Sequence, residues 1–390
     1  MDPVRNPHAP GAGQQPPELA GRGSEIASFD VTLERALAGR PVRSPILCGL
    51  RGVGKTVLLN AFRSEALRQG WGTGKIEGRA EQPLRQPSAQ AIHRAVREVG
   101  GQSRDGARLR RLLAVLKSFS LKAAPDRSWA FSLDVDAVAG RADSGDLETD
   151  LTELFLDAAE AAADLGTGLV LFVDEAQESA PKTWAALCGA CHEISQASLP
   201  LLVVGAGLPH LPAVLTSAKS YAERLFSYTR IDRLGRADAD HALSAPAARE
   251  DVRFTGEALD RLANASDGYP YFIQAYGKAA WDAAPRSPIT EADVDGSVRD
   301  AYDELAVGFF GSRWERATPR EKAYMHAMAE LGDRPAPSAD VVSAMGRRRH
   351  SDVSVYRDGL IKKGLIYSGE RGTVAFTVPH FARFVRSQPR

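Results

Sequence analysis

Apolar residues recur along the chain in two patterns, short runs and helically spaced stripes. Short runs without a charged residue, typical of parallel strands buried on both faces, occupy residues 44–48, 169–173 and 199–204, and Ser44 is the one polar residue in them. Weaker strands are predicted at residues 71–78 and 129–135 and in a segment ending at Ile231. Amphipathic helices are predicted among these strands, at residues 90–99, 107–122, 147–165 and 183–195. Alternating strands and helices indicate an α/β fold with a doubly wound parallel sheet, whose ligands bind at the carboxyl ends of the strands.

The pattern changes twice after this core, which we assign to residues 21–235. Helical stripes alone predict an α-helical lid over residues 236–310. Three further helices and a hairpin then follow, which is the layout of a C-terminal winged helix-turn-helix over residues 311–390. Residues 1–20 are rich in Pro, Gly and Gln, and we predict a disordered tail there.

One glycine-rich segment fits a phosphate-binding loop of the P-loop NTPases. Gly49 to Thr56 match G-x-x-x-x-G-K-[ST] and lie between a predicted strand and a predicted helix, the context that the motif requires. The glycines let successive N–H groups point into one concavity, to which the helix start adds positive partial charge. Lys55 is expected to reach the β- and γ-phosphates, and the Thr56 hydroxyl to bind Mg²⁺. The predicted ATP-binding residues are Gly49, Arg51, Gly52, Val53, Gly54, Lys55, Thr56 and Val57.

Two acidic residues end the run at 169–173. We expect Asp174 to hold Mg²⁺ together with Thr56, and Glu175 to be the catalytic base that polarises the attacking water. A buried strand that merely ends in acids is common. Because this one follows a full phosphate loop within a single α/β domain, the pair predicts a Walker B motif.

Composition excludes several other classes of protein. Neither a membrane-spanning run of ~20 apolar residues nor a signal core is visible, so the sequence predicts a cytoplasmic protein without a membrane partner. Three cysteines are too few for a disulfide framework. Cys188, Cys191 and His192 spell the haem-attachment pattern C-x-x-C-H. They fall in a predicted helix of an ATP-binding domain, which favours two packed thiols over a haem or redox site.

The formal net charge is +0, but the charges are unevenly distributed. Residues 313–390 contain 15 Lys and Arg against 8 Asp and Glu, so the remainder carries a matching acidic excess. This segregation favours a C-terminal domain that faces DNA. The residues that we expect at DNA phosphates are Arg347, Arg348, Arg349, Arg357, Lys362, Lys363 and Arg371. Two alternatives stay open, a merely solvated basic surface and a winged helix that binds protein.

The order of these parts resembles the AAA+ ATPases related to archaeal and eukaryotic replication initiators, and the similar STAND-type ATPases. The resemblance extends over about residues 21–390. It implies ATP binding, ATP hydrolysis and assembly into a homo-oligomer in which an arginine finger completes the neighbouring subunit's site. Arg224 is the candidate finger and Arg230 the second choice, although Arg224 is equally suited to a surface ion pair.

The sequence departs from this family at two sensor positions. The strand that ends at Gly205-Ala206-Gly207 lacks the Asn, Ser or Thr that the family uses to orient the attacking water. The lid helix lacks the family's γ-phosphate-sensing arginine, for which Lys278 is a poor substitute. Rapid hydrolysis is therefore in question.

The combined prediction is an ATP-binding AAA+/STAND protein that hydrolyses ATP and whose nucleotide state controls its assembly and the presentation of a winged helix to DNA. Two rivals remain, a nucleotide-dependent switch whose winged helix binds protein, and a helper ATPase of a mobile-element or defence system.

Overall fold

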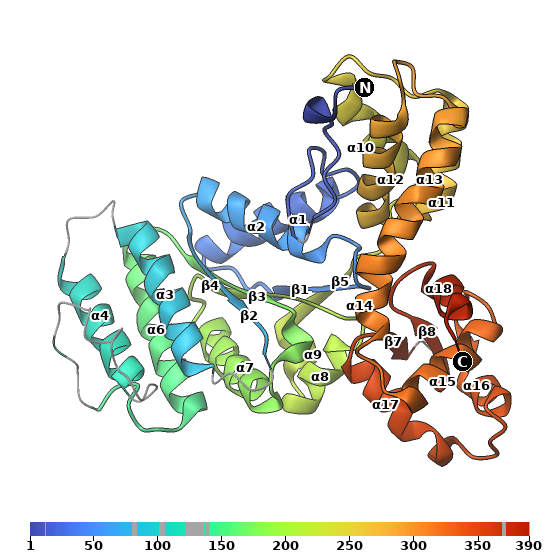
Figure 1. Ribbon diagram of the computed structural model, residues 1–390. Helices are drawn as coiled ribbons and strands as arrows, with labels where there is room; N and C mark the ends of the chain where they lie inside the picture. Colours follow the sequence, from blue (N-terminus) through green and yellow to red (C-terminus); the bar gives the residue numbers. More distant parts are fainter. Residues whose placement is uncertain are drawn as a thin grey trace. The chain divides into compact units, whose positions relative to one another are not determined.

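The computed structural model describes residues 1–11, 13–79, 84–100, 106–121, 136, 140–368 and 372–389. The chain forms two compact units (Figure 1). One comprises Arg22–Gly49 and Lys55–Ile231, and the other comprises Met1–Gly21, Leu50–Gly54 and Asp232–Arg390. The strand predicted at residues 129–135 lies outside the described residues.

The first unit is built on a five-stranded parallel sheet, which confirms the predicted fold class. Its strand order is β2-β3-β4-β1-β5, and each neighbouring pair is parallel. The central strands β1, β3 and β4 are buried along their whole length, as their largely apolar sequences predicted. The strands are β1 Ser44–Cys48, β2 Gly72–Glu77, β3 Leu169–Asp174, β4 Leu201–Gly207 and β5 Phe226–Arg230.

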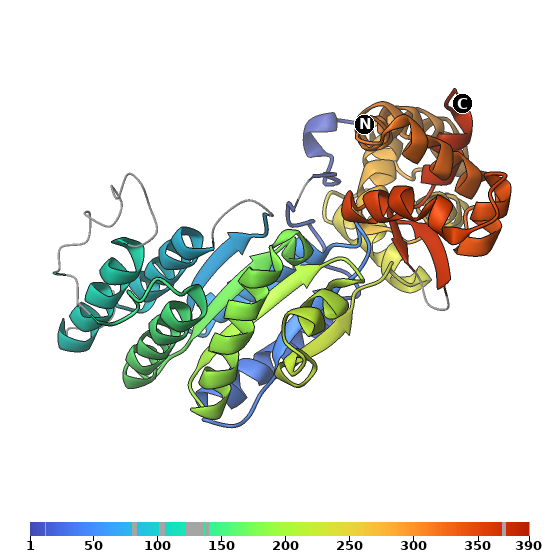
Figure 2. The ribbon, with the colours of Figure 1, turned by 90° about the horizontal axis from the view of Figure 1, so that it is seen from below.

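Helices cover both faces of this sheet. Helices α1 and α2 lie on one face, where the rings of Phe29 and Phe62 stack with centroids 4.3 Å apart. Helices α7 and α8 lie on the other face, which is the near face when the molecule is seen from below (Figure 2). Trp184 of α7 and Phe226 of β5 are both fully buried there. The helices of this unit are α1 Gly23–Leu37, α2 Lys55–Arg68, α3 Arg85–Gly100, α4 Gly106–Leu121, α6 Leu147–Asp164, α7 Pro181–Gln196, α8 Leu211–Ala218 and α9 Ala222–Leu225.

Glycines let α3 pack closely on the edge strand β2. A side chain at Gly72 would place its Cβ 2.2 Å from the carbonyl oxygen of Ala95, and one at Gly74 would lie 2.6 Å from that of Ala91. Gly72 and Gly74 are therefore required by the helix that covers the strand, although glycine is unfavourable within a strand.

The second unit contains a helical region and a small mixed module. The helical region comprises α10 Arg236–Ala248, α11 Gly256–Ser266, α12 Pro270–Ala283 and α13 Glu291–Leu305. The chain continues through a π-helical turn, Ala306–Phe310, into α14 Gly311–Trp314. The predicted domain boundary at residue 310 thus falls within a continuous helical stretch.

The module that follows has three helices, a three-stranded antiparallel sheet of order β6-β8-β7, and a final helix. Its elements are α15 Pro319–Glu330, β6 Ala336–Pro337, α16 Ser338–Ala344, α17 Ser354–Lys362, β7 Ile366–Ser368, β8 Thr373–Phe376 and α18 Phe381–Ser387. Phe310 is fully buried and lies 5.9 Å from Phe381 and 5.6 Å from Phe384, ring centroid to ring centroid. This aromatic cluster packs α18 against the π-helical turn.

Residues 1–20 were predicted to be a disordered tail, and the structure instead places their described part against the helical region. The Asn6 amide donates to the carbonyl oxygen of Lys278 at 3.0 Å and to the Asp282 carboxylate at 2.8 Å. The Trp281 indole N–H donates to the carbonyl oxygen of Asp2, and His8 is buried. The segment is poor in apolar residues, so its own composition gave no sign of contacts made through backbone and amide groups.

Candidate nucleotide-binding site

The phosphate loop connects β1 to α2, as predicted. Gly52 and Gly54 have φ values of +82° and +90°, which only glycine adopts without strain, whereas Gly49 is not among the positive-φ residues. The N–H of Gly49 instead donates to the carbonyl oxygen of Gly207 at 3.1 Å, which ties the start of the loop to the end of β4. Helix α2 begins at Lys55, so the loop ends at a helix N-terminus, where anions bind.

Side chains of the loop differ in exposure. Val53 is fully buried, and Arg51, Lys55, Thr56 and Val57 are partly exposed. The helix that follows the loop is anchored by Leu58 and Leu59, both fully buried. Lys55 and Thr56 therefore lie at the start of a helix that is packed into the core.

Thr56 and Asp174 converge, although they are 118 positions apart in the sequence. The Thr56 hydroxyl donates to Asp174 Oδ1 at 3.2 Å. One hydroxyl and one carboxylate are hard oxygen donors of the kind that Mg²⁺ binds when phosphate and water oxygens complete its shell. The residues present therefore fit a magnesium ion shared with a nucleotide. Elsewhere in the part of the chain that the structure describes, no cluster of three or more His, Cys, Asp or Glu is suited to a metal.

A lysine that the sequence analysis missed also reaches Asp174. The Lys75 ammonium of β2 lies 3.2 Å from Asp174 Oδ2 and donates to the Asn60 side chain of α2 at 2.9 Å. Its signal in the sequence was a single lysine within a strand that is otherwise short of charge. The positive charge of Lys75 compensates the negative charge of the partly buried Asp174 carboxylate. Its hydrogen bond to Asn60 also links β2 to α2.

Glu175 lies directly after β3 in a left-handed backbone conformation, with φ +44° and ψ +42°. This region is sparsely populated by residues other than glycine and costs energy. The surroundings hold it there: the Glu175 N–H donates to Asp174 Oδ1 at 3.0 Å, and the Gly78 N–H donates to the Asp174 carbonyl oxygen at 2.7 Å. A Cβ at Gly78 would lie 2.4 Å from the Glu175 carbonyl oxygen. Gly78 is therefore needed for the turn that aims Glu175.

Gln177 is a second residue that the sequence analysis did not assign. Its amide nitrogen donates to Glu175 Oε2 at 2.5 Å, and its amide oxygen accepts from the Leu208 N–H at 3.0 Å. The amide thus bridges the predicted base and the residue that follows β4. The sequence signal was indirect, a polar side chain two positions after the base combined with a β4 end that has none.

Arg224, the candidate arginine finger, lies on the short helix α9 and is exposed, and Arg230 is exposed at the end of β5.

The cysteines behave as packed thiols. Cys188 is buried in α7, and burial raises its pKa to about 12, so it is protonated at neutral pH. The structure thus offers no reactive thiolate at Cys188.

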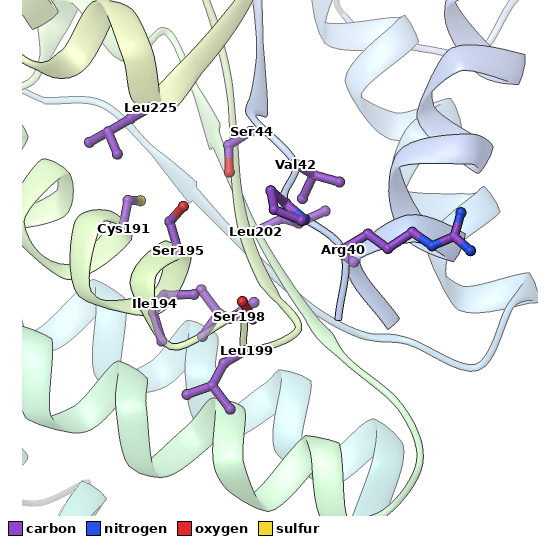
Figure 3. A pocket seen from close by; sticks show the side chains of 13 residues that line it. Arg40, Val42, Ser44, Cys191, Ile194, Ser195, Ser198, Leu199, Leu202 and Leu225 are labelled. Carbon is purple, nitrogen blue, oxygen red and sulfur yellow. The ribbon is translucent and has the colours of Figure 1, made fainter. Parts of the chain in front are cut away.

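A separate pocket lies at the opposite end of the parallel strands (Figure 3). It is lined largely by apolar side chains and by Ser44, Cys191 and Ser195. Ser44 begins β1 and Leu201 begins β4, so the pocket lies at the amino ends of the strands, whereas the loop and the acidic pair lie at the carboxyl ends. Arg40 is among its lining residues, and its guanidinium points away from the hollow. This pocket is not the candidate nucleotide site.

Comparison with known proteins agrees with this geometry. Residues 18–204 match the family described as the AAA ATPase domain. The Walker-type ATPase PABY2304 of Pyrococcus abyssi has a similar structure, with a TM-score of 0.58 at 15% sequence identity, and the match covers 95% of this chain and 97% of that one. The chain has the P-loop AAA+ fold.

Two further solved structures resemble the chain at lower similarity. The RuvB Holliday junction branch migration motor of Thermotoga maritima matches with a TM-score of 0.47 and 17% identity over 93% of this chain and 96% of that chain. Cdc6p of Pyrobaculum aerophilum matches with a TM-score of 0.46 and 14% sequence identity, and the match covers 100% of this chain and 99% of that chain. Residues 307–385 match a domain of unknown function, DUF8462. No protein of curated function matches the sequence.

The basic residues predicted to contact DNA differ in exposure and in their partners. Arg347, Arg348 and Arg349 are exposed in the segment before α17, and Lys362 is exposed at the end of α17. Arg357 is partly exposed and bonds the neighbouring Asp358 at 3.0 Å, whereas Arg371 lies outside the described residues.

Lys363 differs from the exposed residues, because it forms an internal ion pair. Its ammonium bonds Glu321 Oε2 at 2.5 Å, and the Glu321 side chain is only 7% exposed. Burial alone would raise the pKa of Glu321, but hydrogen bonds from Lys363 and Thr318 outweigh it and lower the pKa. This pair argues against the predicted role of Lys363 at DNA.

A search of the described residues for membrane-spanning helices found none with the length and hydropathy that a span requires.

Proposed function

We propose that the protein binds ATP with Mg²⁺ and hydrolyses it, and that the nucleotide state controls self-assembly and DNA binding by the C-terminal module. The observation that supports the ATPase part best is the convergence of Thr56 and Asp174 beside a left-handed Glu175 at the carboxyl ends of parallel strands. These groups come from two distant segments, the start of α2 and the end of β3, and their order in the sequence is that of a phosphate loop and a Walker B strand.

Each residue has a defined part in this proposal. The backbone of the loop and Lys55 bind the phosphates, while Thr56 and Asp174 hold the metal. Bound Mg²⁺ supplies neutralisation of phosphate charge. Glu175 accepts a proton from the attacking water, and Arg224 of one subunit reaches the phosphates held by its neighbour. An exposed position for Arg224 is what such a role requires.

The test of this part separates binding from hydrolysis. Lys55→Ala should weaken ATP binding, and Glu175→Gln should retain binding but lose most of the turnover, because only the water-activating group is changed. Affinity is measured with a fluorescent ATP analogue and turnover by phosphate release. Binding by Lys55→Ala at the wild-type affinity would remove the phosphate-loop assignment, and wild-type turnover by Glu175→Gln would place the base elsewhere.

For the C-terminal module, we propose a winged helix-turn-helix that contacts DNA phosphates. Three helices followed by a β-hairpin, and the exposed run Arg347 to Arg349, support it. DNA binding is measured by fluorescence anisotropy over a salt series, with and without ATP and Mg²⁺. Replacing Arg347, Arg348 and Arg349 by alanine should weaken binding and make its salt dependence shallower.

A second candidate function is favoured by the surface of α17 itself. Val355 is 75% exposed on this helix. Arg357 is paired with Asp358, and Lys363 beyond the helix end is paired with Glu321, so neither cation is fully available to phosphates. These features suit a nucleotide-dependent switch whose C-terminal module binds a protein. The absence of DNA binding in both nucleotide states would favour this second function.

A further inference from the structure

The end of β4 carries no polar side chain, and a side chain from another element fills the place beside it. Gly205, Ala206 and Gly207 end the strand at the level of the phosphate loop, since the Gly49 N–H bonds the Gly207 carbonyl oxygen. The amide of Gln177 lies there, with its oxygen 3.0 Å from the Leu208 nitrogen. The hydrogen-bonding group that β4 lacks is therefore supplied by the turn after β3.

The small residues of β4 make room for this amide. A Cβ added at Gly207 would lie 2.6 Å from Gln177 Oε1, closer than a Cβ comes to an atom of another residue. A larger residue at position 207 would displace the Gln177 side chain. The strand end is thus shaped around Gln177, which is a second observation, independent of the hydrogen bonds themselves.

The two ends of the amide have fixed and different partners. The Leu208 N–H is a donor, so the amide oxygen must face it, and the amide nitrogen then faces Glu175 Oε2 at 2.5 Å. The same nitrogen has one more distant acceptor, Glu178 Oε1 at 3.4 Å. Gln177 therefore donates to one oxygen of the Glu175 carboxylate, Oε2.

We propose that Gln177 is the positioning residue of the hydrolytic site, which holds the Glu175 carboxylate in the orientation for accepting the proton of the attacking water. This inference rests on the proposed ATPase function. A glutamate side chain has three rotatable bonds, and its backbone here lies in a left-handed turn, so the carboxylate needs an anchor outside its own residue. Gln177 supplies that anchor from the Leu208 backbone.

The experiment compares steady-state ATP turnover and ATP affinity of the full chain in wild type, Gln177→Leu and Gln177→Glu. Gln177→Leu removes both hydrogen bonds, while Gln177→Glu keeps the shape and the acceptor for Leu208 but sets a carboxylate against Glu175. Both variants should lose about 10- to 100-fold in kcat, as expected for the loss of a hydrogen bond to a charged group, with the dissociation constant of the fluorescent ATP analogue unchanged within about twofold. Gln196→Leu, the same change at the exposed end of α7, is the matched control and should keep the wild-type kcat.

A double-mutant cycle decides whether Gln177 acts through Glu175. In the Glu175→Gln background, Gln177→Leu should cause no further loss, because the group that it positions has already been removed. A further 10-fold loss in that background, or a kcat within twofold of wild type for Gln177→Leu and Gln177→Glu, would overturn the inference. A parallel fall of kcat, affinity and thermal midpoint in both Gln177 variants would also overturn it, since it would mark a structural role. If Glu175→Gln alone turns over at the wild-type rate, the assignment of the base fails, a result separate from that of the Gln177 variants.

Discussion

Lys362 and Lys363 are adjacent in the sequence, but Lys362 is exposed and Lys363 forms an ion pair with Glu321. Replacing each lysine by methionine tests whether only Lys363 contributes to stability. Lys363 bonds Glu321 Oε2 at 2.5 Å, and the same carboxylate oxygen accepts from the Thr318 N–H at 2.7 Å. Lys362 is exposed. We expect Lys363→Met to destabilise the C-terminal module and Lys362→Met to leave its stability almost unchanged.

The magnitude follows from the burial of the two partners. Breaking a fully buried ion pair costs about 3–5 kcal/mol, and an exposed pair contributes about 0.2–1 kcal/mol. The Glu321 side chain is 7% exposed and that of Lys363 is 30% exposed, so the pair lies between these limits. The retained hydrogen bond from Thr318 reduces the loss further. We therefore expect a cost of about 1–3 kcal/mol, which raises the equilibrium for local opening about 5- to 150-fold.

The assay is amide hydrogen exchange of the full chain, read on peptides from α15 and α17, because exchange reports local opening without requiring two-state unfolding. Both helices should exchange faster in Lys363→Met, while peptides of the parallel sheet keep the wild-type rate. Equal protection of α15 and α17 in wild type, Lys362→Met and Lys363→Met would refute the reasoning.

The effect should also depend on pH, with a sign that the pKa shift fixes. The folded-state pKa of Glu321 lies below its ordinary value of 4.5, so its stabilising contribution is present above that pH and is lost as the pH falls through the lower folded value. The difference in protection between wild type and Lys363→Met is therefore expected to be full at pH 7 and to shrink below about pH 4.5.

Three further predictions concern the first unit. Arg85 Nη2 bonds Asp150 at 2.6 Å, and Asp150 is fully buried, so Asp150→Asn should lower stability by about 2–4 kcal/mol in thermal or urea unfolding. Burial would raise the pKa of Asp150, but hydrogen bonds from Ser144 and Arg85 outweigh it and lower the pKa. The loss of stability in Asp150→Asn should therefore stay constant from pH 8 to 5. A loss of stability that vanishes at pH 6 would contradict this. Gly78→Ala should reduce ATP turnover more than ATP affinity, because its Cβ would lie 2.4 Å from the Glu175 carbonyl oxygen, and equal losses in both would argue against this placement. Asp174→Asn should weaken the dependence of ATP binding on Mg²⁺, measured by titrating the metal, and an unchanged titration would remove Asp174 from the metal site.

Local patterns were sufficient to predict the architecture. Strands β1, β3 and β4 are recognisable because a strand buried on both faces is apolar along almost its whole length, and the phosphate loop because its glycines, Lys55 and Thr56 have a fixed spacing. These signals depend on neighbours within a few residues. They needed no knowledge of the tertiary structure.

What the sequence could not predict depends on partners far apart in the chain. Lys363 looks like a surface lysine until Glu321, 42 positions earlier, is found beneath it. The N-terminal segment resembles a disordered tail until Asn6 is placed beside Lys278 and Asp282, more than 270 positions away. Composition describes what a segment can bury by itself, and both features arise from burial against something else.

The turn after β3 shows how the sheet can determine the chemistry at its edge. A left-handed glutamate persists only where its surroundings over-determine it, and Glu175 is held through its own N–H, through the close approach of Gly78 and through the amide of Gln177. Gly78 follows β2, Gln177 follows β3, and Leu208, which anchors the amide, follows β4. Three neighbouring strands thus converge on one carboxylate, and a displacement of any one of them would move it. The missing polar residue of β4 therefore need not mean a missing function, because the Gln177 amide lies beside the end of the strand and the Leu208 N–H, directly after β4, holds that amide.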